Sequence, residues 1–185
     1  MKTKWLVVGL GNPEGQYFNT WHNLGFVAAE RMGAEFKQKG NMLIAEQDNT
    51  FIIKPLTYMN RSGEAVLAII RKRGIKPENI IVFVDDLYID KGKIKIVIGG
   101  GSGGHNGIKS INQLLGTPEY IKIKIGIKPQ REVADFANYV LSRVPEGEKT
   151  IISEALDNAT TAARMLISGE PLEIVQGKFN TRNEK

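Results

Sequence analysis

The chain has 185 residues, of which 42% are hydrophobic and 24% are charged, and this length and balance predict one globular domain, residues 1–185, with a substantial core. It contains no cysteine, which excludes disulfides, zinc sites built on thiolates and cysteine nucleophiles. Lysine and arginine outnumber the acidic residues by 25 to 20, and the net charge of +5 is compatible with a nucleic-acid partner but is also found in proteins that bind nothing acidic.

The chain carries no predicted membrane segment. No apolar run approaches the roughly 20 residues that a membrane span needs. The first apolar segment is interrupted by Gly9 and Gly11, which is not the pattern of a signal peptide. We therefore expect a protein that is not held in a membrane and that is located in the cytoplasm.

The first elements along the chain predict strands and a helix. Residues 5–10 form an apolar strand candidate, and residues 22–33 have helical spacing that ends at a glycine. Two short extended runs follow at residues 42–46 and 51–54, separated by an Asp-Asn turn. Pro55 is expected to end the second run.

The middle of the chain continues the alternation of strands and helices. Residues 62–73 predict a helix, and the continuous apolar run at residues 80–84 predicts a buried central strand. Residues 93–98 and 121–127 alternate like half-buried strands, with a predicted helix at residues 108–115 between them.

The last part of the chain predicts two helices, at residues 132–141 and 146–168. No internal repeat or linker divides the sequence. The order of elements therefore predicts a mixed α/β domain.

Lysines alternate along two of the predicted strands. Lys91, Lys93 and Lys95 share one face, and Lys122 and Lys124 share another, because strand side chains repeat every two residues. A solvent-exposed face is the simpler interpretation of each row. Two neighbouring rows would instead make a surface that follows a phosphate backbone, and charge alone does not choose between these interpretations.

Two glycine-rich stretches suggest nucleotide binding, but each fails its motif test. In "VVGLGNPEGQYFNTWHN", residues 7–23, Glu14 stands where a dinucleotide-binding turn needs its third glycine. In "GGGSGGHNG", residues 99–107, the next lysine, Lys109, follows Ile108 instead of the glycine that a Walker loop requires. Ser102 lacks the G-x-S-x-G frame of a hydrolase nucleophile. A nucleotide-dependent oxidoreductase or phosphotransferase is therefore disfavoured.

The two histidines of the chain, His22 and His105, each follow a loop that closes a strand, which is where α/β sheets hold their sites. Without cysteine or a helical i, i+4 histidine pair, they give little support for a metal, and we expect none. Asp85 and Asp86 follow the predicted strand at residues 80–84. Such an aspartate either fixes a histidine tautomer or begins a turn, and both interpretations stay open.

Asparagines supply the remaining candidate polar groups. Asn12, Asn60 and Asn106 lie in the unusual stretches, although Asn60 or Ser62 could instead cap the helix predicted at residues 62–73. No protein nucleophile is evident. Amides that bind peptide groups, together with a histidine–aspartate base, point to activation of water rather than to covalent catalysis.

Four motifs, in order and over nearly the whole chain, resemble the bacterial peptidyl-tRNA hydrolase family. They are "GLGNPEGQYFNTWHN", "KPLTYMNRSG", the acidic pair of "VDDLYIDKG", and "GGGSGGHNGIKS", after which "IKIGIKP" also matches. The resemblance implies a single-domain α/β globule with a twisted mixed β-sheet flanked by helices, and no metal or cofactor. It also implies hydrolysis of the ester that joins a peptide to the 3′ ribose of tRNA, which recycles tRNA from prematurely released peptidyl-tRNA.

The resemblance also implies a role for individual residues. His22 is expected to be the base that activates water, Asp85 to hold and stabilise that histidine, and Asn12 to distinguish N-blocked from free aminoacyl-tRNA. His105 is expected to support the glycine-rich loop without a catalytic role. The other residues expected to bind the substrate are Tyr17 and Tyr58 at the tRNA end, Met59 in the pocket, and the amides of Asn60 and Asn106.

The expected partner is peptidyl-tRNA, held at its acceptor end and along its phosphates by a basic surface of a monomer. Two residues depart from the family pattern. Trp21 stands where the family has arginine, and Glu14 replaces a glycine. Neither change removes a reacting group, so we expect activity to survive, with altered tRNA contact and an altered first loop.

A non-catalytic RNA-binding protein is the alternative prediction. Proteins that resemble this family assist intron splicing in plant organelles, and a fold alone does not guarantee hydrolysis. A binding module would be free to lose His22, whereas this chain retains it together with Asp85. Hydrolysis is therefore the favoured prediction.

Overall fold

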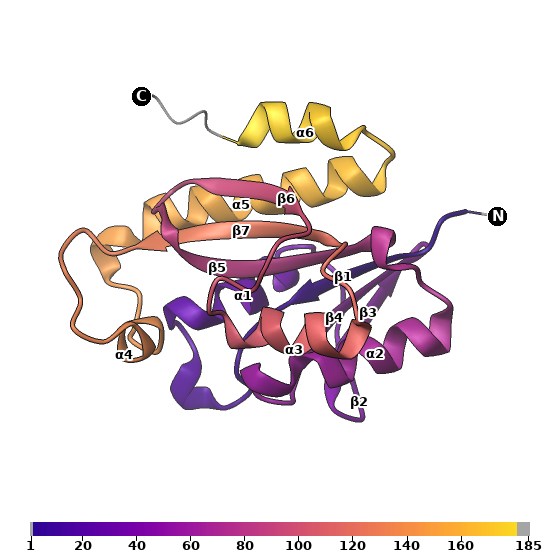
Figure 1. Ribbon diagram of the computed structural model, residues 1–185, viewed down its shortest axis with the longest axis horizontal. Helices are drawn as coiled ribbons and strands as arrows, with labels where there is room; N and C mark the ends of the chain where they lie inside the picture. The colour runs from indigo at the N-terminus through magenta and orange to yellow at the C-terminus, as the bar shows by residue number, and fades with distance from the viewer. Residues whose placement is uncertain (1, 181–185) are drawn as a thin grey trace.

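The computed structural model describes residues 2–180, and its strands form a seven-stranded sheet in the order β2-β3-β4-β1-β5-β7-β6 (Figure 1). β1 is parallel to β4 and β5, and β5 is parallel to β7, whereas β2, β3 and β6 pair antiparallel. The predicted mixed α/β class is therefore confirmed. The strands are β1 (Trp5–Gly9), β2 (Lys37–Lys39), β3 (Met42–Gln47), β4 (Thr50–Pro55), β5 (Ile80–Asp90), β6 (Ile94–Ile98) and β7 (Ile121–Lys128).

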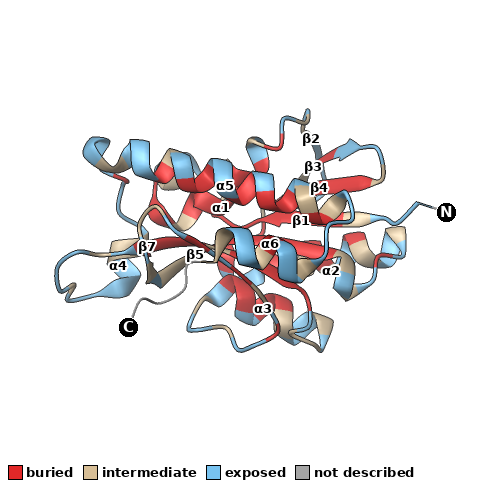
Figure 2. Ribbon diagram, turned by 90° about the horizontal axis from the view of Figure 1, so that it is seen from above, coloured by how far each residue is buried: buried red, intermediate tan, exposed pale blue. Residues whose placement is uncertain are grey.

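Helices cover both faces of this sheet (Figures 1 and 2). Those on one face are α1 (Leu24–Glu30), α5 (Lys149–Ile167) and α6 (Leu172–Phe179), and those on the other are α2 (Ser62–Arg73) and α3 (Asn106–Leu115). The short α4 (Phe136–Val140) follows β7. Among the described residues, no helix has both the length and the apolar character that crossing a bilayer requires.

The central strands supply two hydrophobic cores, one under each layer of helices. Leu6 and Val8 of β1 pack with α2 and α3, whereas Val7 between them packs with α1 and α5, because successive strand side chains point to opposite faces. β5 contributes to both cores in the same way. A strand buried on both faces is therefore apolar at every position, which explains the continuous run at residues 80–84.

The end of β1 lies unusually close to α1. The backbone N–H of Leu10 donates to the carbonyl of Phe83 on β5, and the N–H of Phe26 donates to the carbonyl of Leu10. A Cβ added to Gly25 would lie 2.5 Å from both the nitrogen and the oxygen of Leu10. This contact sets the start of α1 and with it the 3-10 turn η2 (Trp21–Asn23), which carries a predicted site residue.

The central strand β5 extends beyond the predicted residues 80–84. Asp85 pairs with Ile125 and Asp86 with Gly126 of β7, and the ladder becomes irregular between Asp86 and Asp90. The sequence prediction ended the strand where the apolar run ends. Backbone hydrogen bonds to β7 nevertheless continue past that point, because they do not depend on the side chains of the strand.

Other boundaries differ in smaller ways. Pro55 ends β4, as predicted, but it is itself the last paired residue of the strand, opposite Met42. The helix predicted at residues 132–141 is shorter, because Asp135 caps α4 by accepting hydrogen bonds from Ala137 N and Asn138 N. The helix predicted at residues 22–33 begins as the 3-10 turn η2 and ends with α1. β2 and α6 were not predicted.

We expect Gly25→Ala to lower the free energy of unfolding by about 1–3 kcal/mol, because the new methyl group overlaps the backbone of Leu10. Chemical denaturation followed by circular dichroism measures this loss. Gly177→Ala is the matched control: a Cβ there meets no atom within 4 Å, and alanine in the interior of α6 should be neutral or stabilise by roughly 0.5–1 kcal/mol. Equal stability of the two variants would contradict the close contact.

Candidate active site

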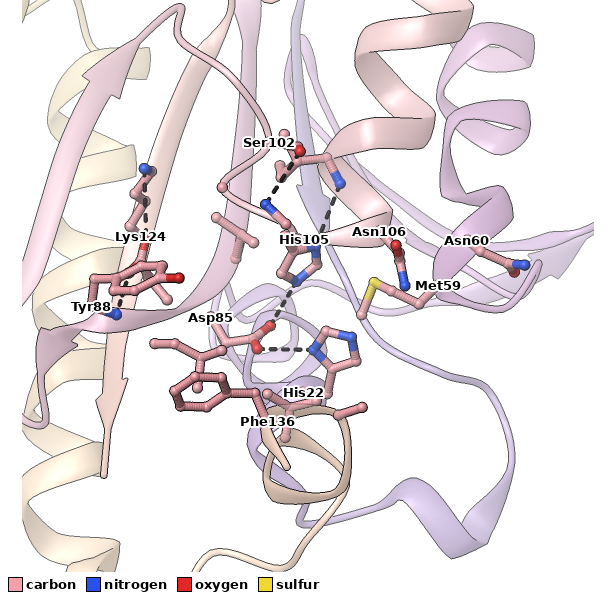
Figure 3. Close-up of a pocket in the computed structure, with 18 of the residues that line it drawn as sticks. His22, Met59, Asn60, Asp85, Tyr88, Ser102, His105, Asn106, Lys124 and Phe136 are labelled. Carbon is pink, nitrogen blue, oxygen red and sulfur yellow. Dashed lines mark hydrogen bonds and ion pairs between the residues drawn. The ribbon is translucent and has the colours of Figure 1, made fainter. Parts of the chain in front are cut away.

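The carboxylate of Asp85 lies between both histidines of the chain (Figure 3). Its Oδ2 is 2.9 Å from His22 Nδ1, and its Oδ1 is 3.0 Å from His105 Nε2. Asp85 belongs to β5 and His22 to the turn before α1, and His105 is the N-cap residue of α3. Three segments that are distant in sequence therefore meet at one buried carboxylate.

Hydrogen bonds determine which nitrogen of each histidine carries a proton. Nδ1 of His105 accepts hydrogen bonds from the backbone N–H groups of Gly107 and Ile108, so Nε2 is its donor to Asp85. His22 donates through Nδ1 to the same carboxylate. When His22 is neutral, its Nε2 is therefore an unprotonated acceptor on the side of the ring away from Asp85.

His105 does more than the resemblance implied. Its side chain caps α3 at the end of the glycine-rich loop, where the resemblance implies a supporting role. Its hydrogen bond to Asp85 and its position 4.7 Å from the ring of His22 were not predicted. The sequence gave no signal for this contact, because the path of the chain between residues 85 and 105 cannot be predicted from local sequence patterns.

The two histidines and the carboxylate change each other's ionisation. Burial lowers the pKa of His22, but the charge of Asp85 and the hydrogen bond to it outweigh burial, so the pKa of His22 is raised above its ordinary 6.5. Burial raises the pKa of Asp85, and the two histidines more than reverse this and hold it well below its usual range. Asp85 is therefore ionised at neutral pH. Its stabilising contribution is lost only as the pH falls through this lowered pKa.

The histidine pair opens into a cavity of about 610 Å³. Figure 3 shows side chains from several elements around this cavity. Every residue that the resemblance assigned to the site lines it except Tyr17, which lies in the turn Gly15–Tyr17 outside the lining. The residues brought together are Asn12, His22, Tyr58, Met59, Asn60, Asp85 and Asn106.

Asn12 is buried and held by three hydrogen bonds. Its Oδ1 accepts from the N–H of Met59, its backbone N–H donates to Asn23 Oδ1, and its carbonyl accepts from Asn23 Nδ2. Among residues 2–180, Nδ2 of Asn12 has no hydrogen-bond partner, and Asn12 lines the cavity, so this amide donor is available to a ligand. Asn23, which follows the catalytic-histidine candidate in sequence, is a supporting residue that the sequence reasoning missed.

Asn60 lies in a turn and not at the cap of α2. Arg61 occupies the cap position, without a side-chain hydrogen bond, and the hydroxyl of Ser62 instead donates to the carbonyl of Met59. The capping interpretation of Asn60 and Ser62 is therefore wrong. Tyr58, just before this turn, has φ 62° and ψ 158°, a conformation that costs non-glycine residues of the order of 1–3 kcal/mol.

The open choice about the acidic pair is also resolved. Asp85 binds the histidines, whereas Asp86 accepts a hydrogen bond from the N–H of Tyr88 and lies 3.5 Å from Lys124 Nζ. One aspartate thus holds the histidines, and its neighbour shapes the turn and pairs with a lysine. Both line the cavity.

The two departures from the family pattern have structural partners. The hydroxyl of Tyr58 donates to the carboxylate of Glu14, which joins the first loop to the rim of the cavity. Trp21 is buried, stacks on Tyr139 with ring centroids 5.7 Å apart, and lies 4.8 Å below the ammonium of Lys91.

The lysine rows are only partly solvent-exposed. Lys122 is buried, with 1% of its surface exposed, so the prediction of an exposed face is wrong for this residue. Lys91 precedes β6 and pairs with Glu148 at 2.7 Å, so it does not share a strand face with Lys95. Lys95 is exposed and lies opposite Lys124 in the β6–β7 ladder.

Further cavity residues were not predicted to belong to the site. Tyr88 is 72% exposed and Phe136 of α4 is 48% exposed, and both line the cavity with Lys124. Tyr88 belongs to the motif "VDDLYIDKG". Its position three residues after Asp85 could have identified it from the sequence as a candidate site residue. Phe136 carries no signal in the sequence, because the course of the chain after β7 decides its position.

The ligand atoms of His22, Asp85 and His105 lie within 4.8 Å of one another, a spacing that could hold a metal ion. The facing nitrogens and both carboxylate oxygens are, however, already hydrogen-bonded to each other. The donor set is therefore satisfied without a cation.

Comparisons with known proteins agree with the predicted resemblance. The family described as peptidyl-tRNA hydrolase matches residues 6–185. The peptidyl-tRNA hydrolase of Syntrophotalea carbinolica is 37% identical over 96% of this chain and 97% of its own, and that of Anaeromyxobacter sp. (strain K) is 40% identical over 88% and 89%. The crystal structure of peptidyl-tRNA hydrolase from Acinetobacter baumannii is 30% identical, with a TM-score of 0.88 over 98% of this chain and 96% of that one.

We expect Asp85→Asn to bring the pKa of His22 below 6.5. The substitution removes the charge that raises this pKa and leaves the burial that lowers it. Titration of the imidazole carbon resonances by NMR measures the change. Asp86→Asn is the control, since Asp86 faces Lys124 rather than a histidine, and it should leave the pKa of His22 raised. A raised pKa that persists in Asp85→Asn would refute the coupling.

Proposed function

We propose that His22 is the general base with which this chain, which belongs to the peptidyl-tRNA hydrolase family, cleaves the ester of peptidyl-tRNA. The family assignment makes the chain a hydrolase that acts on ester bonds. The observation that supports the role of His22 is its hydrogen bond to the buried carboxylate of Asp85 at the floor of the cavity.

The proposed reaction uses both nitrogens of the His22 ring. Nε2 accepts a proton from water while the water oxygen attacks the ester carbonyl, and Asp85 stabilises the imidazolium through Nδ1. The tetrahedral intermediate then expels the ribose oxygen, which takes the proton back from Nε2. The products are a peptide carboxylic acid and a tRNA with a free 3′ hydroxyl, so atoms and charges balance.

The raised pKa of His22 sets the direction of the pH dependence. A protonated imidazole accepts no proton, so turnover should be low below this pKa and should rise as the pH passes through it. Asp85 makes His22 a stronger base and at the same time moves the useful pH range upward.

Amides around the cavity are proposed to hold the peptide part of the substrate. The free Nδ2 of Asn12 would donate to the carbonyl that blocks the amino group, a group that an unblocked aminoacyl-tRNA lacks. Asn60 and Asn106 are exposed and line the cavity, and both lie on the same side of the two histidines as Met59 (Figure 3). They are proposed to bind further peptide carbonyls or the developing oxyanion, with Met59 and Tyr58 in apolar contact with the substrate.

The tRNA is proposed to approach over β6 and β7. Lys95 and Lys124 face each other across these strands, and Lys128 is exposed at the end of β7. Such cations neutralise phosphates and make binding sensitive to salt. Tyr88, which is exposed and lines the cavity together with Lys124, would stack on an unpaired base of the acceptor end. Tyr17, outside the cavity, is proposed to contact the tRNA end from the other side.

We further propose that the enzyme works as a monomer in the cytoplasm, where its tRNA substrate is found. The cavity is lined by residues of a single chain, so the proposed reaction requires no residue from a second copy. The reaction as derived needs no metal or cofactor.

We expect His22→Ala to lose about 10²–10⁴-fold in turnover of an N-acetylated aminoacyl-tRNA, the usual contribution of a general base. The variant should keep its circular dichroism spectrum and its salt-sensitive binding of tRNA. Hydrolysis of unblocked aminoacyl-tRNA by the wild-type protein is measured in parallel. A near-normal rate in His22→Ala would overturn the proposed base, and tRNA binding without hydrolysis by the wild-type protein would favour the RNA-binding alternative.

We expect Asn12→Asp to lower kcat/KM for the N-acetylated substrate by about 10-fold or more, because a carboxylate cannot donate to the blocking carbonyl. The ratio of kcat/KM for the N-acetylated substrate to kcat/KM for unblocked aminoacyl-tRNA should fall at the same time, because a carboxylate attracts the free ammonium group of the unblocked substrate. Asn158→Asp, on the exposed side of α5, adds the same charge away from the cavity as control. Unchanged discrimination in Asn12→Asp would remove this residue from substrate recognition.

A further inference from the structure

We infer that Lys122 is a positioning residue whose charged ammonium clamps the two ends of the glycine-rich segment 99–118 and thereby holds His105 against Asp85. This inference rests on the proposed function, because it concerns the same histidine–aspartate cluster. The known members of that cluster touch each other directly, whereas Lys122 acts on them through the backbone.

Lys122 is a buried lysine on β7. Its side chain is among the largest fully buried ones of the protein, with 1% of the residue surface exposed. Its Nζ donates to the carbonyl of Gly99 at 2.9 Å and to the carbonyl of Pro118 at 3.2 Å. In the described part of the chain, both of its hydrogen-bond partners are thus neutral carbonyls. A buried ammonium without a carboxylate is costly, which indicates that the contact is more than incidental.

The two carbonyls lie at opposite ends of one segment. Gly99 follows β6 and begins the glycine-rich loop, and Pro118 lies between α3 and β7. Gly99 has φ 73°, and a Cβ there would lie 2.8 Å from Glu119 Oε1. The start of the segment is therefore packed against its end, and one ammonium group bonds to both.

Everything that this segment contributes to the site lies between the clamped ends. His105 caps α3 and reaches Asp85, and Asn106 lines the cavity. Four glycines of the loop, Gly99, Gly100, Gly103 and Gly104, have positive φ, so the loop backbone has many alternative conformations. The hydrogen bonds from Lys122 to the two ends of the segment restrict the conformations of the loop, and the proposed positioning of His105 requires this restriction.

The clamp depends on charge. Burial and, secondarily, the neighbouring Lys124 lower the pKa of Lys122 to about 8, while Glu119 opposes this change. The ring of Tyr120 lies 4.2 Å from Nζ and favours the ammonium form. Residues opposite Lys122 in the ladders are Val82 on β5 and Val97 on β6, which carry no charge.

Deprotonation would weaken both hydrogen bonds, because a charged donor binds about twice as strongly as a neutral one. Above about pH 8 the ends of the segment would therefore loosen. His105 and Asn106 would then be held less firmly, so kcat should fall. KM should rise as well, because Asn106 is proposed to bind the substrate and both Asn106 and Lys122 line the cavity.

The test compares Lys122→Arg and Lys122→Met with the wild-type protein, using N-acetylated aminoacyl-tRNA and a pH range that spans the pKa values of His22 and Lys122. Arginine stays charged throughout this range, and methionine keeps a similar volume without charge. Rates are corrected for spontaneous ester hydrolysis. Lys76→Met, an exposed lysine remote from the cavity lining, is the matched control.

The expected result is a wild-type kcat that falls on the alkaline side and a Lys122→Arg variant that lacks this fall. Lys122→Met should have a kcat about 10-fold below that of the wild type at neutral pH, and this difference should narrow above about pH 8, where wild-type Lys122 loses its own charge. A Lys122→Met profile identical to that of the wild type, or an alkaline fall that persists in Lys122→Arg, overturns the inference. His22→Ala is assayed in parallel. Retained turnover in this variant, or tRNA binding without hydrolysis by the wild-type protein, would count against the proposed function rather than against the clamp.

A second readout needs no enzymatic activity. The imidazole carbon resonances of His105 in the wild-type protein should show an inflection at the pKa of Lys122, about 8, and this inflection should be absent in Lys122→Arg. If His105 does not sense the titration of Lys122, the clamp is refuted even where Lys122→Met fails to fold.

Discussion

The buried carboxylate of Asp85 is the group on which the arrangement of the site depends. A carboxylate that is only 5% exposed is strongly disfavoured unless donors satisfy both of its oxygens, and here two imidazoles do so. Each imidazole must therefore be delivered from a different direction, one by the turn before α1 and one by the start of α3. The site thus lies at the carboxyl ends of the parallel strands β1 and β5, where the loops that follow these strands converge.

Glycine serves this convergence in two physically different ways. At Gly25 the absence of a side chain lets α1 touch the backbone that follows β1, which fixes the turn carrying His22. In the segment after β6, positive φ angles let the chain reverse direction and present His105. The first use makes the backbone rigid and the second leaves it adaptable. A loop of the second kind needs an external constraint if its histidine is to stay on a buried carboxylate.

Sequence reasoning succeeded where periodicity or a motif carried the information. The hairpin of β3 and β4, the long helix α5 and the pairing of His22 with Asp85 followed from local pattern or from family resemblance. It failed where the partner of a segment decided the outcome. β5 continues through Asp85 and Asp86 because β7 pairs with it, and Lys122 is buried although its strand alternates. Alternation shows which residues share a face, but only the tertiary fold shows what covers that face.

Trp21 illustrates how a departure from a family pattern can be accommodated by residues distant in sequence. An indole supplies no charge, yet Lys91 places its ammonium 4.8 Å from that ring and pairs with Glu148 at 2.7 Å. A cation is thus retained beside the residue that precedes His22, supplied from the turn between β5 and β6. The indole also stacks on Tyr139 of α4, so the same side chain joins the histidine turn to the helix that closes one side of the cavity. The turn that carries His22 is therefore held through Trp21 by ring stacking on Tyr139 and by the nearby ammonium of Lys91.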